Sequence, residues 1–345
     1  MNGLLPGLVI IVALSGMWFV YGMFYSWGED EKGDNWDDNR DMTFSSTQPT
    51  AGTQRPDEPI LPISPLSGLD PQKVALGQIL FHDVRLSRNG TISCATCHDL
   101  MRGGVDHLPR SFGVDNAEGS VNTPTVYNSV FNFRQFWDGR AATLEEQVEG
   151  PLLNPVEMAT DWRHIITVLS ADAQISARFR AIYNTPPTQQ GVQEVIAEFE
   201  RSLVTPSRVD RWLRGDGKAL SEEELAGYQA FKRHGCMACH QGENVGGNLF
   251  QRFGIMQDYF AGREASQADL GRFNVTGREE DRYVFKVPSL RNVAITAPYF
   301  HDASVNTLEE AVAIMGRYQL GVDLPREDVQ AIVLFLHALT GERLQ

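Results

Sequence analysis

Cys94-Ala95-Thr96-Cys97-His98 places two thiols three positions apart, with an imidazole directly after the second. Covalent attachment of haem needs this order, because each thiol adds to a vinyl group and the histidine ligates the iron. The order returns at Cys236-Met237-Ala238-Cys239-His240, and the two motifs contain every cysteine of the chain. A redox pair or a zinc site is the alternative, but the histidine that ends both motifs favours haem. We therefore predict two covalently bound haem c groups, on Cys94, Cys97 and His98 and on Cys236, Cys239 and His240.

Length and charge narrow the class of protein. A chain of 345 residues suits about two domains that each bury a core, and one haem motif lies in each half. The formal net charge of -14 and the pI near 5.0 exclude a nucleic-acid-binding protein and suit a basic protein partner.

The first 27 residues predict a transmembrane anchor. Residues 2–28 have no charged side chain, and the 22 residues from Leu4 to Tyr25 can span the roughly 30 Å core of a bilayer as a helix. A cleaved signal peptide, which would leave a soluble periplasmic protein, is the alternative. The apolar run continues past the small residues at 13–15 and favours the anchor. Since haem c is attached outside the cytoplasm, we expect the globular part on the periplasmic face of a bacterial inner membrane.

Residues 28–60 are acidic and polar, and they predict a flexible tether because they offer few apolar side chains for a core. An N-terminal haem domain over 61–210 and a C-terminal haem domain over 211–345 are expected to follow. Strand signals are scarce, so the predicted fold class is mainly α, with long loops around the haem groups. Helices are predicted from Asp70-Pro71 to about His82, over 162–183 and 190–204, from Ser221 to Gly235 and over 326–339, with Thr205–Lys218 as the interdomain connection.

An internal repeat follows the two haem motifs at a constant offset of 164 positions. The matching stretches are Pro124-Thr125-Val126-Tyr127-Asn128 with Pro288-Ser289-Leu290-Arg291-Asn292, Asp138 with Asp302, and Thr143-Leu144-Glu145-Glu146 with Thr307-Leu308-Glu309-Glu310. Each copy ends in the Thr-x-x-Glu pattern of a helix capping box. The two halves are therefore predicted to be duplicated domains.

The repeat also shows where the halves differ. Met315 matches Pro151 at the same offset, and only the methionine has a lone pair that can ligate iron. Met315 is therefore a candidate sixth ligand of the second haem, with ordinary core packing as the alternative. Trp137 matches His301, an aromatic ring in one copy and an imidazole in the other.

These stretches together resemble the bacterial dihaem cytochrome c peroxidases, a family that includes the MauG-type enzymes. The resemblance covers residues 61–345 and implies two cytochrome-c-like domains, with a peroxide-reducing N-terminal haem and an electron-accepting C-terminal haem. Besides Met315, it rests on Leu86-Ser87-Arg88-Asn89-Gly90-Thr91, Phe136-Trp137-Asp138-Gly139-Arg140, Val156-Glu157-Met158 and Pro298-Tyr299-Phe300-His301-Asp302.

The resemblance implies roles for single residues. Met315 falls at the methionine ligand of the high-potential haem, and Trp137 falls at a tryptophan between the haems, a candidate electron relay. Glu157 falls at the distal carboxylate that moves a proton between the peroxide oxygens. Core packing of Trp137 and a solvated surface position for Glu157 are the alternatives. His301 is expected near the second haem rather than as a ligand.

A calcium ion between the domains is also implied. Asn122, Thr296 and Pro298 fall where the family binds calcium, the last two through backbone carbonyls.

One position departs from the family pattern. Many relatives carry a distal histidine in a Gly-His-Gly context, which blocks the first haem until the second is reduced. Here that position is Val114, and His107 is the nearest imidazole, with a solvated loop position as its alternative. We therefore predict that the first haem is open or water-ligated when fully oxidised, and that gating by reduction is absent or arises differently.

These observations predict a membrane-tethered peroxidase that reduces hydrogen peroxide to water with electrons from a small cytochrome c or a cupredoxin. A MauG-like enzyme that oxidises a partner protein is one alternative, although such enzymes have tyrosine where Met315 stands. A dihaem electron carrier or sensor without turnover is the other. Relatives commonly form homodimers, and a homodimer is compatible with the sequence.

Overall fold

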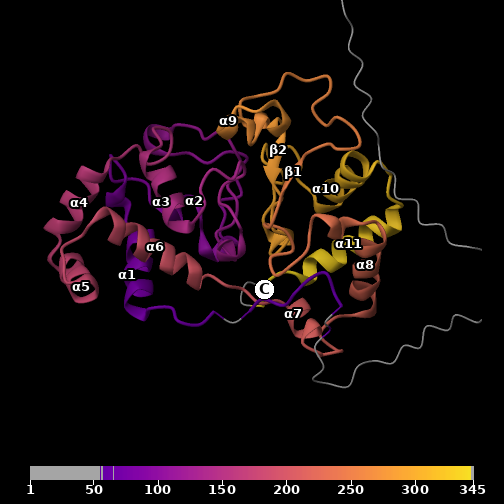
Figure 1. The fold of residues 1–345 in the computed structure, drawn as a ribbon, viewed down its shortest axis with the longest axis horizontal. Helices are drawn as coiled ribbons and strands as arrows, with labels where there is room; N and C mark the ends of the chain where they lie inside the picture. The colour runs from indigo at the N-terminus through magenta and orange to yellow at the C-terminus, as the bar shows by residue number, and fades with distance from the viewer. Residues whose placement is uncertain (1–54, 56, 65, 343–345) are drawn as a thin grey trace, which may run out of the picture. The chain divides into compact units, whose positions relative to one another are not determined.

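The structure is a computed structural model that describes residue 55, residues 57–64 and residues 66–342 (Figure 1). The predicted membrane anchor at 1–27 and most of the predicted tether lie outside these residues. Within them, no helix combines the length and the apolar character needed to cross a membrane.

The described chain is mainly helical, as predicted. Its two strands, β1 (Phe250–Arg252) and β2 (Val284–Lys286), pair antiparallel with Phe250 opposite Lys286. The α-helices are α1 (Pro71–Phe81), α2 (Cys94–Cys97), α3 (Leu144–Leu153), α4 (Trp162–Ala171), α5 (Ala173–Tyr183), α6 (Gln189–Ser202), α7 (Arg208–Leu213), α8 (Glu222–Arg233), α9 (Phe273–Thr276), α10 (Leu308–Ile314) and α11 (Arg326–Ala338). The π-helix η9 (Met315–Leu320) directly follows α10. Single 3-10 turns are η1 (Val84–Leu86), η2 (Leu100–Arg102), η3 (Val114–Asn116), η4 (Ser129–Phe131), η5 (Cys236–Ala238), η6 (Ala268–Leu270), η7 (Glu279–Asp281) and η8 (Val293–Ile295).

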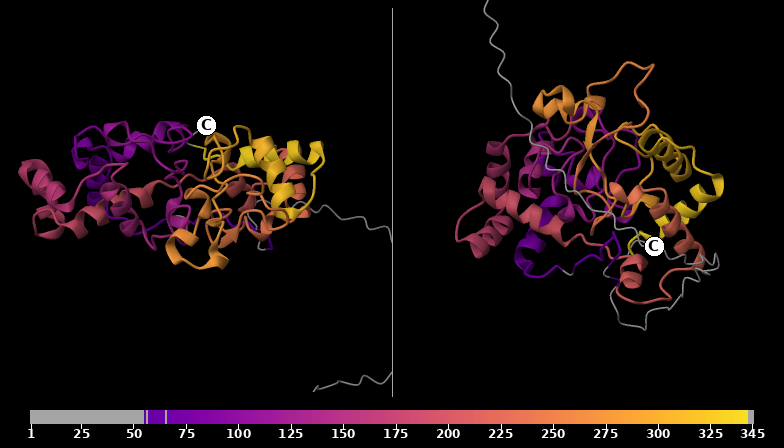
Figure 2. Two further views of the ribbon diagram at one scale, coloured as in Figure 1. Left: turned by 90° about the horizontal axis from the view of Figure 1, so that it is seen from above. Right: turned by 45° about the vertical axis from the view of Figure 1, so that its right-hand side comes forward.

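Two large apolar cores lie in the described chain, one for each half of the sequence. The first is formed mainly by α1, α3, α4, α5 and α6, and the second by α7, α8, α10 and α11 (Figures 1 and 2). Ile60 belongs to the second core although it precedes the first haem motif. The N-terminal segment therefore packs against the C-terminal half.

Each core contains a close crossing of two helices. Gly77 of α1 faces Val195 of α6, and Gly227 of α8 faces Ala331 of α11; a Cβ at either glycine would overlap the facing carbonyl oxygen. A pair of phenylalanine rings lies at each crossing, Phe81 with Phe199 and Phe231 with Phe335. The duplication thus includes these helices, at offsets that differ from 164 because the loops between them differ in length.

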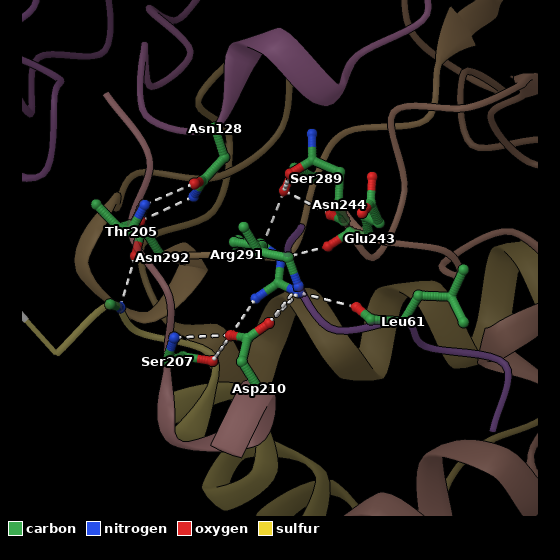
Figure 3. Close-up of polar contacts among 12 residues, drawn as sticks. Leu61, Asn128, Thr205, Ser207, Asp210, Glu243, Asn244, Ser289, Arg291 and Asn292 are labelled. Atoms are coloured by element: carbon green, nitrogen blue, oxygen red, sulfur yellow. Dashed lines mark hydrogen bonds and ion pairs between the residues drawn. The ribbon is translucent and has the colours of Figure 1, made fainter. Parts of the chain in front are cut away.

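A buried ion pair joins distant segments of the chain (Figure 3). The guanidinium of Arg291 donates to both carboxylate oxygens of Asp210 at 2.8 and 3.0 Å, and both side chains are fully buried. Arg291 also donates to the carbonyl of Leu61, and Asp210 accepts from the backbone N–H of Ile63 at 2.7 Å. The pair therefore ties the N-terminal segment to the C-terminal half.

Two equivalent asparagines of the repeat bind the same threonine in this region (Figure 3). The equivalent residues Asn128 and Asn292 both donate from their side-chain amides to the hydroxyl of Thr205, at 2.9 and 3.0 Å. One threonine between the halves therefore binds both copies of the repeated asparagine.

The helix starts predicted at Asp70 and Ser221 are confirmed. The Asp70 carboxylate accepts from the first turn of α1, and Ser221 forms a reciprocal capping box with Glu224 at the start of α8. The helical stretch predicted over 162–183 is two helices, because Asp172 leaves the helical conformation and caps α5. Since one aspartate can end one helix and begin the next, periodicity alone did not separate them.

Two further predictions need correction. Thr143 and Thr307 do cap α3 and α10, but Glu146 binds the N–H of Ala142 rather than that of the cap residue, so this box is incomplete. The predicted connection Thr205–Lys218 contains α7, which begins at a capping box between Ser207 and Asp210. This helix crosses the predicted boundary at residue 210, so the exact domain limits stay a prediction.

Candidate haem cavity

A single cavity of about 720 Å³ brings the predicted site residues together. It is lined by all twelve of them, which are Cys94, Cys97, His98, Asn122, Trp137, Glu157, Cys236, Cys239, His240, Thr296, Pro298 and Met315. These residues come from both halves of the chain. The cavity is therefore a shared space rather than two separate pockets.

The first motif forms the short helix α2. Ser93 and Thr96 cap it reciprocally, and the backbone N–H of His98 returns to the carbonyl of Cys94. The Nδ1 atom of His98 lies 3.2 Å from the carbonyl oxygen of Gly104, which accepts its proton in the tautomer that leaves Nε2 as the lone-pair atom. Burial lowers the pKa of His98, which favours the neutral form of the ring that a metal ion needs.

The histidine of the second motif contacts a backbone carbonyl in the same way, but this motif lies on the 3-10 turn η5 rather than on an α-helix. Gly235 has a positive φ of 82° and turns the chain from α8 into η5. The Nδ1 atom of His240 lies 3.3 Å from the carbonyl oxygen of Val245, and burial lowers the pKa of His240 to about 4. Each histidine thus has its Nδ1 atom near a backbone carbonyl oxygen, an arrangement that would leave Nε2 for a ligand in the tautomer that donates from Nδ1.

The residues present fit covalently bound haem. All four cysteines are free thiols, and all four line the cavity with the two histidines. Among the described residues, the one group of at least three His, Cys, Asp or Glu ligand atoms that lie within 4.8 Å of one another is Asp269, His301 and Asp302. Since that group contains no cysteine, the motifs do not converge on a zinc ion as a Cys/His site would.

Glu157 lies in the turn after α3, with its carboxyl group in the cavity wall. Its Oε1 atom accepts a hydrogen bond of 2.6 Å from the amide of Asn154. Burial raises the pKa of Glu157, an effect that the Asn154 amide partly offsets. The carboxyl group is therefore half-buried rather than a freely solvated surface group.

Val114 lies on a loop that is attached to the Glu157 segment. Its backbone N–H donates to the carbonyl of Glu157 at 2.8 Å, and at Gly113 a Cβ would overlap the backbone of Val156 and Glu157. The side chain of Val114 is buried and is not part of the cavity lining. The loop thus lies beside the segment of Glu157 but carries no imidazole there.

His107 does not take the place of the missing histidine. Its Nδ1 atom lies 2.9 Å from the carbonyl of Ala297, and its Nε2 atom lies 3.0 Å from the carbonyl of Arg102. Both ring nitrogens therefore contact backbone oxygens, and His107 is not among the lining residues.

Met315 and Pro151 both line the cavity, as their equivalence in the repeat predicts. Met315 stands at the junction of α10 and η9 and packs against an aromatic cluster that includes Phe253 and Phe285. Pi-helical turns are rare and often lie at functional sites. Pro151 lies inside α3 and offers no side-chain lone pair.

Trp137 and His301 lie where the halves meet. Their rings contact edge to face with centroids 6.3 Å apart, and the indole N–H of Trp137 donates to the carbonyl of Asn122 at 2.9 Å. His301 is buried, and its Nε2 atom lies 2.7 Å from Asp269. His301 is thus a cavity-lining residue with its own carboxylate partner.

The three predicted calcium-binding residues share one part of the wall between the halves. Asn122 donates from its amide nitrogen to the carbonyl of Leu108 at 3.0 Å, which leaves its side-chain oxygen as an acceptor. Oxygen atoms of this kind, with backbone carbonyls at Thr296 and Pro298, are ligands that calcium prefers. The site itself stays a prediction.

Two buried charged residues of the wall were not predicted from the sequence. Glu200 of α6 is buried and its Oε2 atom has no hydrogen-bond partner among the described residues. Lys286 of β2 is also buried in the wall. Lys286 lies 164 positions after Asn122, which is a predicted site residue. The repeat could therefore have identified Lys286 as a residue of the cavity wall.

Comparison with known proteins identifies the family. Residues 71–218 match the family model described as di-haem cytochrome c peroxidase. The chain is 44% identical over 296 residues to the cytochrome c551 peroxidase of Nitrosomonas europaea, which covers 85% of this chain and 87% of that protein. The chain belongs to the dihaem cytochrome c peroxidase family, with a mainly helical, cytochrome-c-like fold.

Further relatives support the peroxidase class. The chain is 50% identical over 300 residues to the cytochrome c peroxidase Ccp of Escherichia coli (strain K12), which covers 86% of this chain and 64% of that protein. The chain thus spans less than two thirds of that relative. A crystal structure of a MauG-like protein associated with microbial copper homeostasis superposes with a TM-score of 0.72 at 29% identity, covering 82% of this chain and 94% of that one. The Nitrosomonas europaea peroxidase, which the chain matches over most of both lengths, makes the chain a peroxidase oxidoreductase.

Proposed function

We propose that this protein reduces hydrogen peroxide to two waters with two electrons and two protons, using electrons from a small cytochrome c or a cupredoxin. The observation that supports this proposal best is one cavity lined by both Cys-x-x-Cys-His motifs, by Trp137 and by the half-buried carboxyl group of Glu157. Two haem c groups on these motifs would supply the redox chemistry that breaks the O–O bond.

Glu157 acts as the acid/base group in this proposal. Its carboxylate would take a proton from one peroxide oxygen and return it to the other, which could then leave as water, while haem groups on the two motifs would supply the electrons. The hydrogen bond from Asn154 holds the carboxyl group in the cavity wall.

The second motif is the proposed point of electron entry. Met315 is the proposed sixth ligand there, and a thioether favours the reduced state of iron. Trp137 offers an aromatic ring between the halves, in contact with His301. The net charge of -14 suits a donor with a basic docking face.

The first motif is proposed as the site of peroxide reduction. Neither Val114 nor Pro151, the residue equivalent to Met315 in the repeat, has a side-chain lone pair that could ligate iron. Both ring nitrogens of His107 contact backbone carbonyls. We expect an iron site that is open or water-ligated in the fully oxidised protein. A calcium ion at Asn122, Thr296 and Pro298, a periplasmic location and a membrane anchor at 1–27 complete the proposal.

Steady-state consumption of peroxide with a reduced small cytochrome c tests the proposal. The fully oxidised and the half-reduced proteins are compared, with haem content measured on the same samples. Equal rates would support the open site. Activity only after reduction would mean that another residue blocks the site, and no turnover in either state would contradict the peroxidase proposal.

A MauG-like oxidation of a partner protein is the second candidate. The likeness to the MauG-like crystal structure and the absence of a histidine at Val114 favour it. Met315 favours the peroxidase, because MauG-type enzymes have tyrosine at the equivalent position. Covalent change in a candidate partner after peroxide addition, without consumption of reduced cytochrome c, would support the MauG-like function instead.

A further inference from the structure

Lys286 is a buried lysine that has no anionic partner among the described residues. Its side chain lines the haem cavity at the end of β2, and the residue is 8% exposed. In the part of the chain that the structure describes, its ammonium group makes no hydrogen bond or ion pair. Burial lowers its pKa to about 8, with no compensating carboxylate. A buried ammonium group is costly unless it is paired, which indicates that the cavity supplies a partner when it is filled.

The backbone around Lys286 is firmly placed. Lys286 pairs with Phe250 across the two strands, and its N–H donates to the carbonyl of Trp137 at 2.8 Å. The equivalent residues of the repeat form the same bond, because the N–H of Asn122 donates to the carbonyl of His301 at 2.8 Å. Asn122 is equivalent to Lys286, and His301 is equivalent to Trp137. Lys286 and Asn122 are therefore equivalent residues on the two sides of the Trp137–His301 contact.

The carboxylates in the cavity wall do not serve as the partner. Asp138, Glu157 and Glu200 are the acidic residues of the lining in the described chain. Asp138 binds Arg140 at 2.9 Å, and Glu157 accepts from Asn154. In the described chain, no hydrogen bond or ion pair joins any of the three to Lys286, and burial is the cause of its lowered pKa. The partner must therefore enter the cavity with the group that fills it.

We infer that the ammonium group of Lys286 binds a carboxylate side chain of a haem held in this cavity. Haem carries two propionate groups, which are the anions that the proposed cofactor would bring into this space. A charge-assisted bond between ammonium and carboxylate would satisfy both groups. The inference rests on the haem attachment in the proposed function and adds an anchoring residue to it.

The inferred pair places a fixed positive charge next to the backbone of Trp137. A cation near a haem stabilises the reduced iron relative to the oxidised iron, because reduction adds one negative charge. Lys286 is thus a positioning residue that orients one haem and raises its reduction potential. Its effect should be confined to the haem whose carboxylate it binds.

The test uses the full dihaem protein and measures both haem potentials by spectroelectrochemical titration. Lys286→Gln should lower the equilibrium constant for reduction of one haem about tenfold, which is 59 mV for a one-electron couple. Lys286→Arg should retain most of the potential. Lys218→Gln is the matched control, because it removes the same charge from an exposed lysine and should change neither potential.

Resonance Raman spectra of the propionate-bending bands give a second readout. A band of one haem should shift in Lys286→Gln, and the haem that shifts is the one that supplies the carboxylate. If Lys286→Gln does not accumulate as dihaem protein, Lys286→Met, which also removes the charge but keeps an apolar side chain in the buried wall, is compared with the wild type, and identical bands and potentials would overturn the inference. Unchanged potentials and bands in Lys286→Gln would overturn it too.

Free anions are distinguished by repeating the titrations with added phosphate. Potentials that depend on phosphate in the wild type but not in Lys286→Gln would assign the lysine to a free anion and overturn the inference. None of these measurements requires peroxide turnover. An inactive protein with the expected shifts would refute the peroxidase function alone, whereas a protein without covalent haem would refute the attachment on which both depend.

Discussion

Replacing Glu157 by glutamine removes a proton carrier while it keeps the size of the side chain and an acceptor for the Asn154 amide. A positioned acid/base group contributes about 10²- to 10⁴-fold to a rate. Glu157 is half-buried and forms no ion pair with any residue that the structure describes, so water can take over its proton transfer only in part. We therefore expect kcat/KM for peroxide to fall about 10²- to 10³-fold, or about 3 to 4 kcal/mol of activation free energy.

The pH dependence gives a second observable for the same residue. Burial raises the pKa of Glu157 above its usual 4.5, and the carboxyl group must be ionised to take the first proton. Activity should therefore fall as the pH drops through this raised pKa, so the acid limb of kcat/KM lies above pH 4.5. In Glu157→Gln this limb should be absent.

Glu149→Gln is the matched control for Glu157→Gln. Glu149 is a half-buried glutamate of α3 that accepts a hydrogen bond of 3.0 Å from the indole of Trp162 and does not line the cavity. The control should retain wild-type kcat/KM and the acid limb. The reasoning fails if Glu157→Gln, with full haem content, keeps the rate and the pH profile of the wild type.

Three further predictions concern the ligand set and the stability of the fold. Met315→Tyr should lower the reduction potential of one haem, whereas the exposed Met256→Tyr should not; equal potentials in all three proteins would contradict the ligand assignment. Arg291→Met leaves the carboxylate of Asp210 buried without its cation and should reduce the free energy of unfolding by about 3 to 5 kcal/mol in denaturant titrations, with partial recovery when Asp210 is also made apolar. Burial raises the pKa of Glu200 to about 8 from the ordinary 4.5, so the folded protein binds more protons than the unfolded chain between these values and the stability of the wild type should fall as the pH rises through this range. In Glu200→Gln the melting temperature, measured between pH 6 and 9, should lack that fall.

The predicted site residues could be found from the sequence because covalent haem attachment fixes residue types at fixed spacing. The repeat then related Met315 to Pro151 and Trp137 to His301, and the structure places all four in one cavity wall. Their roles depend on a cofactor and stay predictions. The sequence could not show that the loop of Val114 is bound to the backbone of Glu157, because that contact joins segments far apart in the chain.

The helix boundaries show a different limit. A repeat offset is constant only where no loop changes length, so the equivalence of Gly77 with Gly227 was not visible at the offset of 164. Each glycine is needed because a neighbouring helix crosses at close range, which is a tertiary requirement. In the same way α7 was overlooked because it is six residues long and lies in a polar segment, where periodicity carries little information.

Three differences between the duplicated halves lie in the wall of the shared cavity. The equivalent pairs Pro151 and Met315, Trp137 and His301, and Asn122 and Lys286 all line the shared cavity. Backbone bonds of 2.8 Å from Asn122 to His301 and from Lys286 to Trp137 preserve the symmetry of the scaffold while the side chains break it. Two identical halves would give two equivalent haem sites and no preferred direction for electrons. We therefore expect that Met315→Ala, which removes the thioether that Pro151 also lacks, would reduce the difference between the two haem potentials in a spectroelectrochemical titration.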